Sequence, residues 1–69
     1  MLKSNIKKIM ITKGVTYKEL EEKTGLSSQT ITRARSHLIS ECRLSTLWSI
    51  ARALDVNVKD LFSDDIKNI

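Results

Sequence analysis

Four hydrophilic side chains near the middle of the chain have a spacing that would place them on one face of a helix. They are Ser28, Gln29, Thr32 and Arg33. Their order, i, i+1, i+4 and i+5, puts them on one side of an α-helix, and the apolar Ile31 lies on the other. An amide such as that of Gln29 can offer a donor and an acceptor to adenine, and the guanidinium of Arg33 can form two hydrogen bonds to guanine. The spacing therefore predicts contact with the base edges of DNA.

The residues that most often support catalysis or metal binding are scarce. The chain has one histidine, His37, and one cysteine, Cys42, and these two cannot complete a zinc site. Neither a glycine-rich phosphate loop nor a cluster of carboxylates stands near them, so we expect no enzyme, no catalytic residue, no metal and no cofactor. We interpret Cys42 as a small loop residue, with a sensor or ligand role as the alternative.

Length and charge narrow the class further. Sixty-nine residues allow one domain with one small core, so we expect a single domain over residues 1–69 with a loose tail at 62–69. The net charge of +4 is unevenly spread, with +6 over residues 1–53 and −2 over residues 54–69. A polyanion should therefore meet the front and middle of the domain.

Hydropathy argues against a membrane protein. No apolar run approaches the roughly 20 residues that span a bilayer, and the amino terminus lacks the apolar core of a signal peptide. We therefore expect a cytoplasmic protein with no membrane partner.

Apolar residues recur with the period of a helix, and nothing alternates as a strand does, which predicts an all-α fold. Start and stop residues divide the chain into five helices. The first lies between a cap at Ser4 and a stop at Gly14, and the fourth ends at Asp55. The second and third helices are expected at 17–24 and 28–36, and a loop is expected over 36–43. The fourth helix is expected to begin at 44, and a short fifth helix to follow a cap at Asn57.

The start of the second helix is clearly marked. Thr16 and Glu19 form a capping box, and Val15 and Leu20 stand where a hydrophobic staple needs them. Gly25 can take the left-handed conformation that stops the helix. The third helix starts three residues later. So short a link forces the two helices to cross steeply and leaves one side of the third exposed.

The chain resembles the phage-repressor or Cro-like helix-turn-helix regulators, the Xre-type family. The similarity covers about residues 5–62 and rests on three stretches, IKKI, KGVTYKELEEKTGLSSQTITR and LSTLWSIARALDVNVKDLF. It implies a compact five-helix bundle of the lambda-repressor type, whose third helix enters the major groove of double-stranded operator DNA. It also implies base contacts from Ser28, Gln29 and Arg33, a weaker one from Thr32, and backbone contacts from Tyr17, Ser27 and the loop near Arg43.

Several positions depart from the family's usual pattern. Tyr17 replaces a glutamine, although its hydroxyl can still reach a phosphate. Glu21 stands where the family has a small residue and Ala34 where it has a bulky aliphatic one, so the two can compensate in volume. The family's arginine late in the first helix and glutamate late in the third are Met10 and Arg35 here. This double change avoids an unpaired buried charge and frees Arg35 for the DNA backbone.

The resemblance implies a sequence-specific transcriptional regulator, a repressor from a phage or another mobile element that binds a near-palindromic operator as a homodimer. Such a protein is bacterial or phage-encoded and nucleoid-associated, and no small-molecule ligand is expected. We expect Trp48 to be partly buried beside the core, with a role in a partner interface as the alternative. The candidate dimer surfaces are the loop after the third helix, the start of the fourth, and the apolar tail of Leu61, Phe62, Ile66 and Ile69.

Two alternatives stay open. Antitoxins and controllers of restriction-modification operons use the same fold and bind DNA in a different circuit. A protein-interaction module that kept the fold and lost DNA readout would fit the departures at Tyr17, Glu21 and Arg35. A salt titration separates this module from a DNA reader, because only DNA binding weakens steeply as salt rises.

Overall fold

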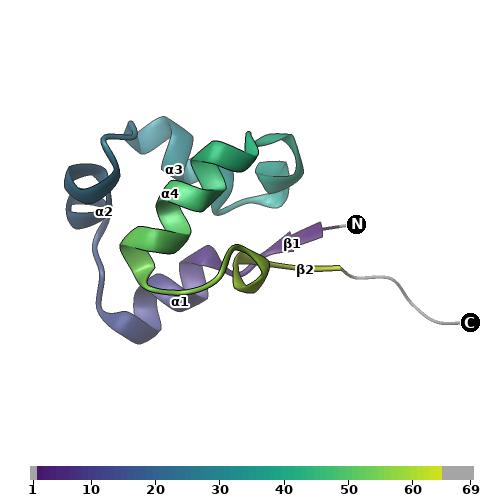
Figure 1. Cartoon of the computed structure of the whole chain (residues 1–69), viewed down its shortest axis with the longest axis horizontal. Coiled ribbons are helices and arrows are strands. Elements are labelled where there is room, and N and C mark those ends of the chain that lie inside the picture. Colours follow the sequence, from purple (N-terminus) through teal and green to yellow (C-terminus); the bar gives the residue numbers. More distant parts are fainter. Residues whose placement is uncertain (1, 65–69) are drawn as a thin grey trace, which may run out of the picture.

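The computed structural model describes residues 2–64, most of which are helical (Figure 1). In chain order the elements are β1 (Leu2–Ser4), α1 (Ile6–Lys13), α2 (Tyr17–Thr24), α3 (Ser28–Ala34), the 3₁₀ helix η1 (His37–Glu41), α4 (Leu44–Leu54), the 3₁₀ helix η2 (Val58–Leu61) and β2 (Phe62–Asp64). Figure 1 shows α2 at the opposite end of the bundle from the two strands. Within residues 2–64, no helix has the length and apolar character needed to span a bilayer.

One apolar core holds the helices together. α4 supplies four of its residues, among which Ile50 and Leu54 are almost completely shielded from solvent. Every other helix adds at least one. The buried side chains are Ile6, Met10, Leu20, Ile31, Ala34, Ile39, Leu47, Ile50, Ala51, Leu54 and Leu61. Among the described residues no polar or charged side chain is buried, so apolar burial dominates the stabilisation of the bundle.

The helix starts follow capping chemistry. The Thr16 hydroxyl accepts a hydrogen bond of 3.2 Å from the backbone N–H of Glu19, as predicted for the start of α2. The Ser27 hydroxyl accepts one of 3.2 Å from the N–H of Thr30 at the start of α3. Each bond satisfies an amide that has no partner within its own helix. For α1 the prediction was wrong: the cap position belongs to Asn5, and Ser4 lies in β1.

The helix ends follow backbone conformation. Gly14 and Gly25 have φ angles of 68° and 74°, which glycine adopts without Cβ strain. Asp55 ends α4 in the same left-handed region, with φ of 58°. The predicted stops are confirmed, and α4 has the predicted bounds.

The expectation of an all-α fold is wrong for the two ends of the described chain. β1 and β2 pair antiparallel, with Leu2 opposite Asp64, Lys3 opposite Ser63 and Ser4 opposite Phe62. Three-residue strands are too short to show alternation in a sequence, and this pairing joins segments about sixty residues apart. The tail expected at residues 62–69 therefore begins with a paired strand, and Ile66 and Ile69 lie outside the described residues.

The five-helix expectation is also corrected. The predicted fifth helix is the single 3₁₀ turn η2, preceded by Asn57, whose N–H donates to Asp60 Oδ2 at 3.0 Å. The loop expected over 36–43 contains the other 3₁₀ helix, η1. α3 ends at Ala34 rather than at 36, and the Ser36 hydroxyl donates to the Arg33 carbonyl at 2.8 Å.

Two side chains lie differently from expectation. Trp48 is 53% exposed and not partly buried, because it sits on the outer side of α4 with the Arg52 guanidinium 4.8 Å from its ring centroid. Leu61 is fully buried in the core, so it is excluded from the candidate dimer surface.

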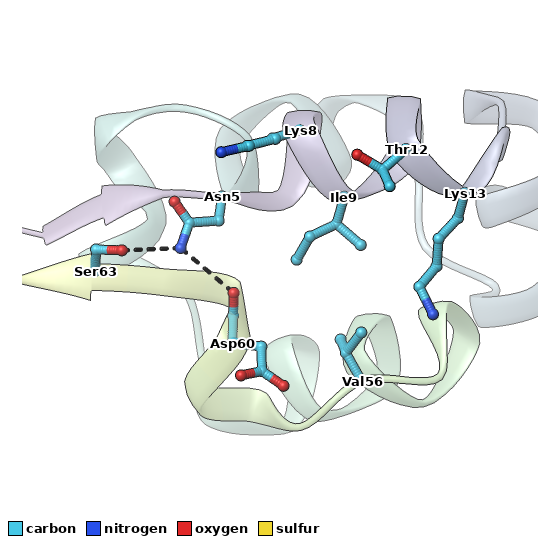
Figure 2. Close-up of a pocket in the computed structure, with 8 residues that line it drawn as sticks. All are labelled: Asn5, Lys8, Ile9, Thr12, Lys13, Val56, Asp60 and Ser63. Carbon is cyan, nitrogen blue, oxygen red and sulfur yellow. Dashed lines mark hydrogen bonds between the residues drawn. The ribbon is translucent and has the colours of Figure 1, made fainter.

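The start of α1 is fastened to the carboxyl-terminal segment beside a groove of about 400 Å³ (Figure 2). Asn5 Nδ2 donates to Ser63 Oγ at 2.9 Å and to the Asp60 carbonyl at 3.4 Å. The Asn5 N–H donates to the Leu61 carbonyl at 2.8 Å. These bonds hold the ends of the described chain together on the side of the bundle away from α2.

Candidate nucleic-acid interface

The link between α2 and α3 is a hydrogen-bonded turn. The Gly25 N–H donates to the Glu21 carbonyl at 2.7 Å. The Thr24 hydroxyl donates to the Leu20 carbonyl at 2.6 Å and accepts from the Leu26 N–H at 3.1 Å. Because Gly25 and Leu26 are both hydrogen-bonded to α2, the turn restricts the direction in which α3 leaves. The two helices form a helix-turn-helix unit.

α3 has one buried face and one exposed face. Ile31 and Ala34 are fully buried. All four side chains predicted to contact base edges are exposed, namely Ser28, Gln29, Thr32 and Arg33. Since the buried face anchors the helix to the core, the exposed face is presented in a defined orientation.

The two ends of α3 are held by side-chain hydrogen bonds. At its start, Ser27 Oγ accepts from the Thr30 N–H and lies 3.0 Å from Thr30 Oγ1. At its end, the Ser4 hydroxyl donates to the Ala34 carbonyl at 2.6 Å. Ser27, which is expected to contact the DNA backbone, is thus the cap of α3. Its side chain is exposed.

Tyr17, Thr32 and Arg35 form one cluster across α2 and α3. The hydroxyl oxygens of Tyr17 and Thr32 are 3.1 Å apart, and the Arg35 guanidinium carbon lies 4.5 Å from the centroid of the Tyr17 ring. Tyr17 and Arg35 are half-buried, unlike Thr32. Tyr17 and Arg35, which are expected to contact the DNA backbone, are thus joined to Thr32, which is expected to contact bases. Their contacts also connect α2 to α3.

Arg33 and Arg43 line one hollow of about 230 Å³ between α3 and the start of α4. Arg43 is exposed and occupies the cap position of α4 without a side-chain cap bond. The other lining residues are Thr30, Glu41, Cys42 and Thr46. With two arginines against the one carboxylate of Glu41, the lining of the hollow has a net positive charge, which suits an anion such as a phosphate.

Cys42 lines this hollow as a free thiol. Burial raises the pKa of the Cys42 thiol above its usual value, while the charge of Arg33 lowers the pKa and that of Glu41 raises it further. Its Sγ lies 3.7 Å from the Leu38 carbonyl. Among the described residues no group of histidine, cysteine and acidic side chains could hold a metal ion.

Thr30 and Thr46 were not singled out from the sequence. Both hydroxyl side chains line the hollow that holds Arg33 and Arg43. Their positions in the sequence give only a weak indication of a place in the site, because each lies in the first turn of its helix. The hollow itself depends on how α3 and α4 pack, which no local pattern reports.

The chain matches the family model of the Cro/C1-type helix-turn-helix DNA-binding domain over residues 5–65. The chain belongs to this family. The match confirms the resemblance stated from the sequence and identifies DNA as the partner of this domain. No curated protein and no solved structure matches the chain.

Proposed function

We propose that this protein is a sequence-specific transcriptional repressor of the phage or mobile-element type, which binds a near-palindromic operator as a homodimer. The observation that carries the proposal is the two-sided character of α3. Its apolar side is fully buried and its polar side is exposed, and both of its ends are pinned by hydrogen bonds. A helix held in this way can enter the major groove without a change in its backbone conformation.

The exposed face of α3 supplies the base contacts in this proposal. Gln29 pairs with adenine and Arg33 with guanine, since each side chain can form two hydrogen bonds in the plane of the base. Ser28 and Thr32 flank them on the same exposed face. A good bidentate contact discriminates against the wrong base by roughly 1–3 kcal/mol.

The residues around α3 supply the backbone contacts. Arg43 is exposed at the edge of the hollow that it shares with Arg33, where its guanidinium can pair with a phosphate. Ser27 is exposed at the start of α3. Tyr17 and Arg35, which are half-buried and stack on each other, supply two further phosphate contacts.

A second copy of the chain is the proposed partner at the start of α4. One short reading helix contacts few base pairs, and dimers of this kind place two such helices in half-sites one turn of DNA apart. Leu44 directly follows Arg43 and is 70% exposed. A two-fold contact between two copies of Leu44 would bury this apolar side chain beside the proposed backbone contact.

Selection of bound fragments from a pool of random duplex DNA tests the proposal. We expect enrichment of a near-palindrome with half-site centres about 10 base pairs apart, and retention that falls steeply with salt. Weak binding with no enriched sequence would refute sequence-specific readout. An enriched half-site without a second copy at that spacing would refute the dimer.

A further inference from the structure

The hydroxyl of Thr32 is already engaged within the protein. Its Oγ1 lies 3.1 Å from the Tyr17 hydroxyl oxygen. Tyr17 is held in turn by the Arg35 guanidinium over its ring, 4.5 Å from the centroid. The hydrogen bond crosses from the first residue of α2 to the exposed face of α3.

This bond determines which end of Thr32 is free. The β-carbon of threonine carries one hydroxyl and one methyl group, so fixing the hydroxyl fixes the methyl as well. Thr32 is exposed, and its hydroxyl is directed at α2. With the hydroxyl turned toward α2, the Cγ2 methyl is the group that Thr32 has left for an apolar contact with a base.

We infer that Thr32 reads thymine through this methyl group and that Tyr17 is the positioning residue that holds it. Thymine is the base that carries a methyl group in the major groove, and a threonine methyl can pack against it. Gln29 and Arg33 on the same face of α3 are suited to purines. Thr32 would thus add a pyrimidine to the half-site by apolar contact. This inference rests on the proposed function, because it needs α3 to lie in the major groove.

Replacement of thymine by deoxyuracil tests the inference, because the two bases differ only in the methyl group. The probe is the duplex enriched from random DNA, in which each thymine is replaced in turn. We expect one replacement in each half-site to weaken binding of the unaltered protein about fourfold, the effect of one buried methyl group.

Three variants assign that loss to Thr32. Thr32→Ser keeps the hydroxyl and removes the methyl group, so it should bind the thymine and deoxyuracil duplexes equally. Thr32→Val loses the hydrogen bond, but valine has one strongly preferred χ1 rotamer in a helix, which still holds a methyl group in place, so this variant should retain most of the fourfold difference. Tyr17→Phe removes the hydrogen bond and keeps the ring beneath Arg35, so the difference should shrink as Thr32 gains rotational freedom.

Two results would overturn the inference. In the first, the enriched duplex shows no penalty for deoxyuracil at any thymine. In the second, Thr32→Ser keeps the full penalty, which would assign the thymine contact to another side chain. Because Thr32 is exposed, the Thr32→Ser variant should unfold on heating at nearly the same temperature as the unaltered protein, which checks that it is folded. Failure to enrich any duplex would instead refute the proposed function on which the inference depends.

Discussion

The Ser4 hydroxyl donates a hydrogen bond of 2.6 Å to the carbonyl of Ala34. It joins the amino-terminal strand β1 to the last residue of α3. Ser4 Oγ also accepts from the Ile6 N–H at 3.3 Å, so the same hydroxyl serves the first turn of α1. The sheet at the end of the bundle is thereby connected to the helix that presents the candidate interface.

Ser4→Ala should lower the free energy of unfolding by about 1 kcal/mol, the usual net contribution of one such hydrogen bond. Urea denaturation followed by circular dichroism measures the change. Ser49→Ala is the matched control, since the Ser49 hydroxyl bonds only to the Ser45 carbonyl within α4. Alanine favours the helix there, so the control should be neutral or slightly stabilising. Equal losses in both variants would contradict the role of Ser4.

Gln29→Ala and Arg33→Ala should each weaken binding to the enriched operator more than binding to random DNA. The physical reason is that base contacts discriminate among sequences, whereas phosphate contacts do not. A loss of roughly 1–3 kcal/mol on the operator is expected for each, measured by fluorescence anisotropy. Thr12→Ala, an exposed polar site on α1, should leave both affinities unchanged. Equal losses on operator and random DNA would remove Gln29 and Arg33 from the base-reading set.

Arg43→Ala should lower affinity for all sequences alike. Because one phosphate contact is lost, the slope of log K against log salt should flatten by about 0.9. Arg52→Ala removes the same charge from the far end of α4, where the guanidinium stacks on Trp48, and serves as the control. An Arg43→Ala slope identical to that of Arg52→Ala would place Arg43 outside the backbone contacts.

Leu44→Ala should weaken dimerisation at least tenfold, since a buried leucine contributes roughly 1.5–3 kcal/mol relative to an exposed one. Ile11→Ala is a close control, because Ile11 on α1 is also 70% exposed. Sedimentation equilibrium with and without operator DNA measures the association. Loss of dimer in the Ile11 variant, and not in the Leu44 variant, would move the interface from α4 to α1.

Alkylation of Cys42 should be slower in the folded protein than in urea at pH 8 to 9. Burial raises the pKa of the thiol in the folded state, so less of it is thiolate at a given pH. The folded state holds this proton more tightly, hence Cys42 lowers stability as the pH rises past its unfolded pKa. The Cys42→Ser variant should lack this alkaline loss. A folded thiol that reacts as fast as the unfolded one would contradict the raised pKa.

Features that depend on neighbouring residues were predicted well. The Thr16 and Ser27 caps and the Gly25 stop act within a few residues of where they stand, so the α2–turn–α3 unit can be derived from the sequence. α4 was placed correctly because its apolar spacing and its stop at Asp55 are local as well. The exposure of Gln29 and Arg33 follows from the same helical period.

Features that join distant segments were missed. The β1–β2 pairing, the Ser4–Ala34 bond and the bond between Tyr17 and Thr32 connect residues 15 to about 60 positions apart. The exposure of Trp48 was missed for the same reason, since a residue at the margin of an apolar stripe is covered only if another element lies over it.

The sequence by itself determined the bounds of α2 and α4, the start of α3, the turn between α2 and α3, and the polar face of α3, because helix propensity, capping and period act over one or two turns of chain. Only the tertiary structure decided that Arg33 and Arg43 share a hollow and that Tyr17 engages Thr32. These contacts depend on how the helices pack in three dimensions, and that packing is a property of the whole core.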